Sequence, residues 1–531
     1  MTELPGKLAC IFASLLVSSA LFAQENDPPP GEQGLSTAER LEILEGELER
    51  VQLERATRTH ESVHGMGPSA SAVYHESEGL TWGGYGEVKY RDYRSSFKAD
   101  EADVHRFVLY AGYRFNDWIV LNTELEYEHA GFESETVRNS AGTGTTSINS
   151  SEVFVEFAYL DFEFARPFQL AVGLNLIPVG ITNYMHEPTT FLAVERSRTE
   201  SDIIPSTWRE IGAIFHGEFG DLVTWRAGVL NGPRGTEFSE SSWIRGGRTK
   251  GSKARAEGLA YVASLDLHPL EGMTLGGSYY RGDSGQGEIS KVTWTGRLLN
   301  PLDSASDPTG LLTTARTIQA NRLKTARVRV HIAEGHFMYN SGPFLMHALF
   351  ARGWMNEDDT RAVNSSTGNN IGQVVEGGYV EAGFNVLSFF DTSHRLYPFF
   401  RYEYLNTQKE TVRRYAGGEE DLNDALCSGI LVGTCKVTGS TATATTLTNQ
   451  DQGVIEGSLA NESYGIRGVA NRVNDRRIAT FGVAYFPDPL VVIKAEYERW
   501  SSASTLHSDI EGLNSSNNKI DRVQVAVGFI F

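Results

Sequence analysis

The charged residues with the spacing to do chemistry gather in one long connection between expected strands, residues 177–208. This connection carries His186-Glu187 and Glu195-Arg196-Ser197-Arg198, and it also holds apolar residues such as Ile177 and Ile203. Mixed apolar anchors and charges predict an ordered loop that folds inward and places its charges across a passage. An ordinary external loop with surface charges is the alternative. The inward fold predicts a constriction formed by His186, Glu187, Glu195, Arg196 and Arg198.

Catalytic patterns are weak by comparison. A hydrolase needs a nucleophile with a base in reach, yet no Gly-x-Ser-x-Gly and no metal-spaced His pair stands out among the 13 His. His331 and His336 are five positions apart on one expected strand, so they are predicted to face opposite sides. We therefore predict no enzymatic activity, no cofactor and no metal. The alternatives are an outer-membrane barrel that hydrolyses lipids or peptides, or one with an adhesive role based on the long Ser/Thr-rich connection 408–475.

The elements that must position these residues are short segments of period-2 alternation that recur from Leu80 onward. At the C-terminus, Val523, Val525 and Val527 alternate with Arg522, Gln524 and Ala526. A wholly apolar face opposite a polar and small face is what a lipid-exposed barrel strand requires. Burying acidic faces in a dry core would cost several kcal/mol per unpaired charge, whereas a wet lumen removes most of that cost.

Sixteen such segments are predicted, joined alternately by short and long connections. Bacterial outer-membrane barrels have an even strand count, short periplasmic turns and longer external loops. The expected strands are 81–92, 104–115, 118–129, 152–164, 167–176, 209–219, 221–231, 256–268, 272–281, 324–339, 343–353, 375–387, 395–407, 476–487, 489–500 and 521–531.

The predicted fold class is therefore all-β, a transmembrane antiparallel β-barrel of about 16 strands with a short N-terminal helical segment. A barrel of this size leaves an aqueous channel. The alternation assigns both signs of charge to the lumen wall. The lumen residues predicted to matter for selectivity are Arg106, Arg226, Arg327, Arg329, Arg401, Lys494, Glu124 and Glu126, with Arg327 and Arg329 as the best anion-attracting pair.

Composition agrees with a membrane barrel. The chain has 531 residues with 54 Gly and 17 Pro, and a mean hydropathy of -0.28. After the first thirty residues, no apolar run is long enough for a membrane-spanning helix. The net charge of -20 argues against binding nucleic acid, because phosphate binding needs concentrated Lys and Arg.

The N-terminal region predicts secretion and assembly. The apolar run from Leu8 to Phe22 and the small residue Ala23 predict a signal peptide over 1–23. Residues 24–79 are predicted to be a periplasmic segment that contains a short coiled coil at about 38–58, and 80–531 the barrel. Leu41, Leu44, Leu48 and Val51 form the coiled-coil seam. Cys427 and Cys435 are expected to form a disulfide in an oxidising compartment, with two free thiols as the alternative.

Four motifs between residues 158 and 212 carry a family resemblance. They are Ala158-Tyr159-Leu160-Asp161, Gly173 to Pro178 with Gly180, Glu195-Arg196-Ser197, and Glu210-Ile211-Gly212. This pattern resembles the phosphate-selective porin O/P family. The resemblance implies a sixteen-stranded, trimeric outer-membrane channel of a Gram-negative bacterium with an inward-folded third loop. The sequence departs from the family at Leu174-Asn175-Leu176, where the family has Gln-Phe-Lys, and that departure puts phosphate selectivity in doubt.

The function expected from these observations is a porin for ion transport, with a water-filled channel for passive diffusion of small hydrophilic solutes. Anions such as phosphate are the candidate solutes. The expected partners are outer-membrane lipid, those solutes or ions, and two further copies of the chain in a homotrimer.

Overall fold

A computed structural model describes residues 61–96, 98–130, 135–138, 145–148, 152–289, 325–412, 470–504 and 518–531. All of them belong to one compact unit of the chain. Three predictions lie outside the described residues: the signal peptide at 1–23, the coiled coil at about 38–58, and the pairing of Cys427 with Cys435.

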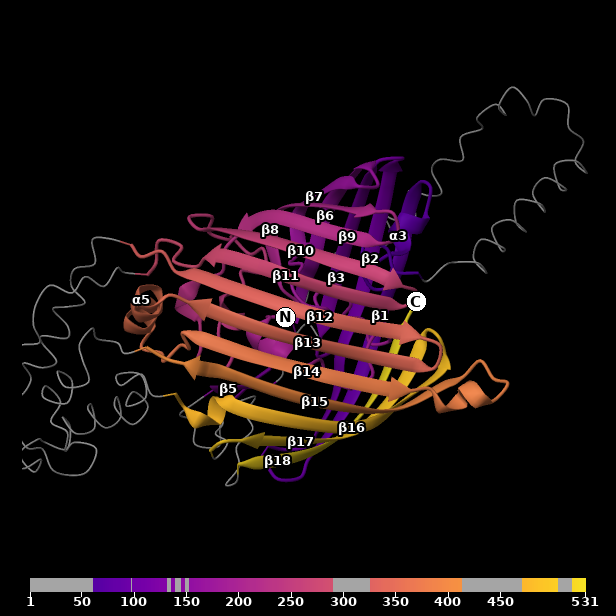
Figure 1. The fold of residues 1–531 in the computed structure, drawn as a ribbon. Helices are drawn as coiled ribbons and strands as arrows, with labels where there is room; N and C mark the ends of the chain where they lie inside the picture. The colour runs from indigo at the N-terminus through magenta and orange to yellow at the C-terminus, as the bar shows by residue number, and fades with distance from the viewer. Residues whose placement is uncertain are drawn as a thin grey trace, which may run out of the picture. The chain divides into compact units, whose positions relative to one another are not determined.

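Sixteen of the described strands close into one antiparallel barrel (Figure 1). The predicted number and order of strands are confirmed. β1 pairs with β18, with Val88 opposite Val527, and this pairing closes the ring. The barrel strands are β1 (Gly79–Tyr93), β2 (Glu101–Asn116), β3 (Ile119–Glu128), β6 (Glu152–Ala165), β7 (Phe168–Leu176), β8 (Arg209–Phe219), β9 (Val223–Asn231), β10 (Leu259–Leu270), β11 (Met273–Asp283), β12 (Arg329–Ser341), β13 (Phe344–Met355), β14 (Val374–Phe384), β15 (Arg395–Glu410), β16 (Asp475–Asp488), β17 (Val491–Ser502) and β18 (Lys519–Ile530).

The remaining elements lie in the connections. β4 (Glu135–Arg138) and β5 (Thr145–Ile148) form a separate two-stranded sheet that the sequence did not predict. The helices and helical turns are α3 (Ala72–His75), η1 (Thr199–Ile203), η2 (Gly235–Glu237), η3 (Arg245–Gly247), α5 (Glu357–Thr367), η4 (Val386–Phe389) and η6 (Arg472–Asn474). Among the residues described, no helix has the length and apolar character to cross a membrane.

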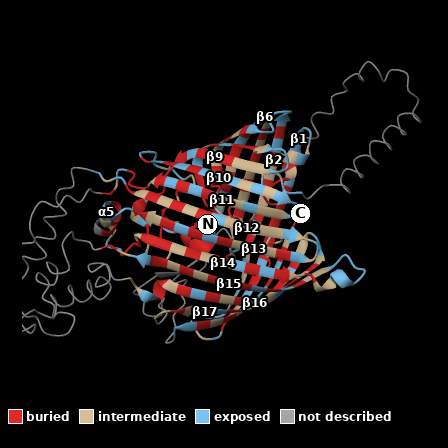
Figure 2. Ribbon diagram, viewed as in Figure 1, coloured by how far each residue is buried: buried red, intermediate tan, exposed pale blue. Residues whose placement is uncertain are grey.

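The strands alternate between an apolar outer face and a polar or small inner face, as Figure 2 shows by the banding of exposed and buried residues. On β18, the side chains of Val525 and Val527 are 40% and 42% exposed, whereas Gln524, which faces the other side of the strand, is fully buried. β3 follows the same rule, with Asn122, Glu124 and Glu126 inside. A closed barrel satisfies every backbone group of its strands internally, so a belt of exposed apolar side chains can face lipid. The closed ring and its exposed apolar side chains are those of a membrane-spanning β-barrel.

The two ends of the barrel differ in their connections. One end has tight turns such as those at Gly220, Gly272 and Gly342, whose positive φ angles of +60°, +72° and +58° favour glycine. We call it the short-turn end. The other end carries the long connections, including 177–208 and 232–258, and we call it the long-loop end. Figure 1 shows α3 and the C-terminus at the short-turn end and α5 at the long-loop end.

An apolar core lies inside the barrel, where the sequence predicted a water-filled lumen. Buried side chains of the connections 177–208 and 232–258 and of α5 pack against inward-facing wall residues in one cluster. Trp243 is fully buried in it and lies over Gly353 of β13, so that a side chain at this position would collide with the indole. The indole N–H donates to the Gly372 carbonyl oxygen at 3.2 Å. The loops therefore form a second layer inside the barrel wall.

This core reverses the expected polarity of β12. Val330 and Ile332 are fully buried and face the core, whereas Arg329 and His331 are partly exposed on the other face. The prediction of an inward pair formed by Arg327 and Arg329 is therefore wrong. The Arg327 side chain is 82% exposed beside Asp283, and Arg329 pairs with Asp359 of α5 at 3.1 Å. Apolar residues point inward here because a dry loop layer, not water, covers this stretch of wall.

Residues 61–78 pack on the inner wall at the short-turn end. Val73 of α3 lies over Gly112 of β2, and the Met66 sulfur lies 3.1 Å from the Tyr159 hydroxyl of β6. Glu187, from the connection 177–208, accepts the backbone N–H groups of Ser69 at 3.1 Å and Ala70 at 2.9 Å. Burial raises the pKa of Glu187 to about 7, although these two hydrogen bonds oppose the rise. We call residues 61–78 the N-terminal strap.

We predict that strap docking depends on pH through Glu187. In the folded protein its pKa lies at about 7, above the ordinary value of 4.5, so burial of Glu187 under the strap is most favourable below about pH 4.5 and becomes less favourable as pH rises to about 7. The whole shift corresponds to about 3 kcal/mol, which is the upper bound for the part that strap docking contributes. Hydrogen exchange at residues 66–75, corrected for intrinsic rates, should show faster opening at pH 8 than at pH 5. Glu187→Gln should abolish the difference, and an equal pH slope in both proteins would contradict this account.

We predict that Trp243→Ala destabilises the inner loop layer. The substitution removes a fully buried indole and leaves a cavity, which typically costs about 3–5 kcal/mol. The left-handed backbone at Trp243 (φ +49°) would remain without the packing that offsets it. Urea unfolding in lipid vesicles should show a lower free energy of unfolding. Gly353→Val should lower it as well, because the added side chain would collide with the Trp243 indole. Unchanged unfolding in both variants would show that the loop layer contributes little.

Candidate functional site

The connection 177–208 crosses the full width of the lumen. It leaves β7 and returns to β8, yet its middle part contacts β15, which lies eight positions from β7 around the ring of sixteen strands. Ile177, Ile203 and Ile204 are fully buried in the inner core and anchor the two ends of the crossing. The inward fold predicted for this loop is confirmed.

Wall charges on the far side hold the loop through its backbone. Glu381, Glu496 and Glu403 accept the N–H groups of Leu192 (3.2 Å), Val194 (2.7 Å) and Thr199, respectively. Lys494 donates to the Ala193 carbonyl at 2.8 Å, and Arg401 to the Glu195 carbonyl at 2.7 Å. Hydrogen bonds with an ionised partner are about twice as strong as neutral ones. These wall charges therefore act as clamps for the loop and do not line an open pore.

A basic cavity of about 420 Å³ lies on the long-loop side of the crossing. Its walls come from β1, β2, β3, β17 and β18, and from the connections 94–100, 177–208 and 232–258. Seven Lys or Arg and three Glu give the lining a formal excess of four positive charges. The charged lining residues are Arg91, Lys98, Arg106, Arg196, Arg198, Arg245, Arg522, Glu128, Glu195 and Glu498.

The three glutamates differ in how far they neutralise the cavity. Glu195 lies 2.7 Å from Arg91 and 3.3 Å from Lys89, and Glu498 lies 2.6 Å from Arg522. Burial alone would raise the pKa of Glu195, but Lys89 and Arg91 hold it well below its usual value. Glu195 is therefore ionised and compensates the wall cations next to it.

The loop arginines are directed mainly to main-chain oxygens. Arg245 donates to the carbonyls of Ser201 at 2.9 Å and Ser206 at 2.7 Å, and Arg196 donates to the His186 carbonyl at 3.1 Å. The Arg196 Nε is buried without a hydrogen-bond partner. Arg198 donates to Asp202 at 2.7 Å. Because carbonyl oxygens carry no net charge, these hydrogen bonds do not neutralise Arg196 and Arg245. Their positive charges are available to attract an anionic solute.

Burial makes these cations costly. It lowers the pKa of Arg245 well below its usual value, with the neighbouring Arg248 lowering it further. Burial likewise lowers the pKa of Arg248 to about 10. An anion entering the cavity would stabilise the charged form of Arg245, which lines it, and Arg can contact carboxylate or phosphate oxygens with two parallel hydrogen bonds.

The structure separates the five residues predicted for the constriction. Glu195, Arg196 and Arg198 line the basic cavity, as does the wall residue Arg106. His186 and Glu187 lie elsewhere in the lumen. His186 is buried 3.3 Å from Glu124, and Glu187 holds the N-terminal strap.

The other predicted lumen charges are internal as expected but have local partners. Glu126 lies 3.5 Å from Arg106. Arg226 lies at the short-turn end, 3.1 Å from Asp266, and donates to the His64 carbonyl at 2.6 Å.

Sequence reasoning missed Arg245 and the wall residues Arg91 and Arg522. Arg245 follows Trp243-Ile244 in the connection 232–258, which mixes apolar anchors and bases as 177–208 does. That mixture was the available signal for a second inward loop.

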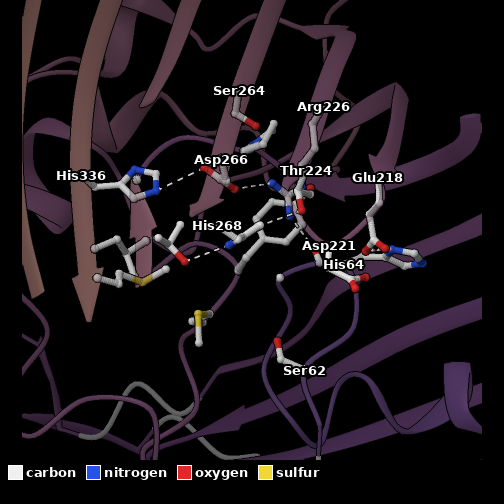
Figure 3. Close-up of a pocket in the computed structure, with 18 of the residues that line it drawn as sticks. Ser62, His64, Glu218, Asp221, Thr224, Arg226, Ser264, Asp266, His268 and His336 are labelled. Atoms are coloured by element: carbon white, nitrogen blue, oxygen red, sulfur yellow. Dashed lines mark hydrogen bonds and ion pairs between the residues drawn. The ribbon is translucent and has the colours of Figure 1, made fainter. Parts of the chain in front are cut away.

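A second cavity, of about 360 Å³, lies at the short-turn end beside the strap. Figure 3 shows Arg226, Asp266 and His336 converging on it from the wall, with His64 of the strap next to Glu218. Asp266 bridges Arg226 and His336, with His336 Nε2 at 3.3 Å. Acids and bases alternate here, so this cavity lacks the positive excess of the first.

Comparison with known proteins finds one sequence relative without a described activity. No family model matches the sequence. An uncharacterized protein of Aquifex aeolicus (strain VF5) is 28% identical over 456 residues, which cover 84% of this chain and 81% of the relative.

Solved structures similar to the chain are outer-membrane barrels. A loop L8 deletion mutant of OmpT, an outer membrane protein of Vibrio cholerae, has a TM-score of 0.42 and 9% identity, over 86% of this chain and all of that one. Salmonella typhi OmpF in complex with Daunomycin has a TM-score of 0.41 and 11% identity, over 86% and 98%. The outer membrane channel DcaP of Acinetobacter baumannii has a TM-score of 0.39 and 11% identity, over 85% and 97%. Similarity at this level says nothing about a solute.

Proposed function

We propose that the protein is an outer-membrane channel that admits small hydrophilic anions by passive diffusion and selects them in the basic cavity. The observation that carries this proposal is the convergence of Arg196, Arg198 and Arg245, from two inward-folded loops, on wall cations of β1, β2 and β18. Selectivity in such a channel comes from the width and the field of its narrowest part. Phosphate and small carboxylates are the candidate solutes.

The size of the cavity supports binding as well as passage. Its volume of about 420 Å³ lies within the roughly 300–1,000 Å³ of typical small-molecule sites. The inner loop layer narrows the rest of the lumen, so we expect a small conductance that saturates with anion concentration.

The wall supports anion preference for a further reason. Glu381, Glu403 and Glu496 are engaged with loop backbone groups, and Glu195 and Glu498 with wall cations. The acids that would attract cations are thus satisfied locally, whereas loop arginines face the cavity. This distribution allows anion selectivity in a chain whose net charge is -20.

We predict that Arg196→Gln combined with Arg198→Gln reduces anion selectivity. Each removed charge is worth about 1 kcal/mol at 4 Å in water, so the anion-to-cation permeability ratio should fall by roughly fivefold for each of the two charges. The measurement is the reversal potential in a planar bilayer under a potassium chloride gradient. Addition of phosphate should block the chloride current of the wild type more than that of the variant.

A matched control is available on the same barrel. Arg327→Gln with Arg329→Gln removes the same charge from exposed positions outside the lumen, and it should leave the reversal potential unchanged. Equal loss of selectivity in both double variants would attribute the effect to overall charge. A correctly folded protein that forms no ion-conducting pore would overturn the proposal.

We also propose that the chain assembles as a homotrimer, as the family resemblance implies. Chemical crosslinking of the full chain, with and without residues 24–73, tests the assembly and the contribution of the expected coiled coil. A crosslinked species no larger than a monomer in both forms would contradict a trimer.

A further inference from the structure

Two histidines and an aspartate meet where the N-terminal strap contacts the barrel wall. His64 comes from the strap, Asp161 from β6 and His216 from β8. Their potential ligand atoms all lie within 4.8 Å of one another, and His216 Nε2 is 3.0 Å from Asp161 Oδ1. Within the described ranges, these three residues are the one group of His, Cys, Asp or Glu side chains close enough to share a metal ion.

This donor set suits a divalent transition metal. Zn²⁺ takes imidazole nitrogen and carboxylate oxygen at about 2.0–2.2 Å in tetrahedral geometry, which places donors about 3.3 Å apart. His216 Nε2 and Asp161 Oδ1, 3.0 Å apart, lie close to that spacing. The other donor-to-donor distances are at most 4.8 Å, so metal binding would have to draw His64 inward by at most about 1.5 Å.

The surroundings also fit a ligand site. The Tyr74 hydroxyl donates to Asp161 Oδ2 at 3.0 Å, which orients the carboxylate. A Glu218 oxygen lies 3.6 Å from Nδ1 of His64, and a Glu163 oxygen lies 3.8 Å from its Nε2. With a metal bound, one of these carboxylates would be the fourth ligand and the other would hold the His64 ring in orientation. His64 Nε2 is a buried atom without a hydrogen-bond partner. Its left-handed backbone, at φ +51°, is a further local strain of the kind found at functional sites.

The charges around this cluster favour the binding of a cation. Arg114 neutralises Glu163 at 2.6 Å, and Arg166 neutralises Glu218 at 3.0 Å. Asp161 is contacted by His216 and Tyr74 and lies at a fully buried position. A metal ion there would compensate a buried carboxylate.

We propose that His64, Asp161 and His216 form a binding site for a divalent transition-metal ion of the zinc class, which ties the N-terminal strap to β6 and β8. The strap lines the short-turn cavity, since His64 and Gly65 form part of its wall (Figure 3). Metal binding would therefore hold the strap in the mouth of the barrel and keep that end of the lumen narrow.

The test uses the full chain, folded in detergent and stripped of metal with a chelator. Titration with Zn²⁺ should show one tight site per chain, and Co²⁺ should give the visible absorption of a nitrogen- and oxygen-ligated tetrahedral ion. His64→Gln and His216→Gln should each weaken zinc binding by at least about tenfold, because even the loss of a residue that only hydrogen-bonds to a metal ligand has an effect of that size. His64→Gln leaves the barrel wall intact, so it separates lost binding from failed folding.

A matched control lies on the same strap. His75→Gln removes an exposed histidine whose Nε2 is 2.9 Å from the Glu61 carbonyl oxygen, and it should leave zinc affinity unchanged. In the wild type and this control, zinc should slow proteolysis within residues 61–78 several-fold, and in His64→Gln it should not.

Three outcomes would overturn the proposal. They are the absence of stoichiometric zinc in the folded wild type, a zinc affinity in His64→Gln and His216→Gln that equals that of the wild type, and zinc binding that leaves strap proteolysis unchanged. The first would mean that the cluster is a network of ion pairs alone. None of these outcomes bears on ion selectivity, which is decided at the opposite end of the lumen.

Discussion

The interior of this barrel depends on the anchoring of one loop backbone by buried wall charges. Leu192, Val194 and Thr199 lie across the lumen from the strands that supply their connection, and their N–H groups would be unsatisfied there without partners. Carboxylates of β14, β15 and β17 accept them, while Lys494 and Arg401 donate to neighbouring carbonyls. Removal of one partner from such a buried pair is strongly destabilising because it leaves the other group desolvated and unpaired.

That anchoring decides which charges remain for a solute. The wall holds acids and bases in similar numbers, so its composition alone indicates no preference. Because the acids of β14, β15 and β17 are engaged with the loop, the field of the cavity is set by cations at its rim and by Arg196 and Arg245. The clamp thus converts a wall of mixed charge into a basic site, and it also fixes Arg196 and Arg198 in position.

The same inner layer gives the two ends of the lumen different characters. The long-loop end has a basic cavity and the short-turn end has a strap held by Glu187 and by the contacts of His64 and Met66. The apolar cluster that includes Trp243 covers part of the inner wall. The barrel therefore resembles a scaffold around an inner folded layer more than an open tube.

The sequence by itself determined the barrel. Period-2 alternation, as in Val523 to Phe529, forces a strand to present an apolar and a polar face, and the alternation of short and long connections indicated sixteen such strands in one barrel. The mixed apolar and charged character of 177–208 was enough to predict that it folds inward. Glu195, Arg196 and Arg198 were therefore named from the sequence as constriction residues, and they line the basic cavity.

Only the tertiary structure decided what the inner faces contact. Alternation shows that Val330 and Arg329 face opposite sides, but the side that is dry depends on whether a loop covers the wall. The second inward loop makes the interior apolar at β12, and Arg329 lies on the opposite face of the strand. Arg245, a residue of that loop, is among the cations that line the basic cavity. Likewise, His64, Asp161 and His216 are separated by up to 152 positions in sequence, and only ring closure and strap docking bring them together. Local patterns encode strands, whereas sites formed between distant segments depend on packing that no local pattern records.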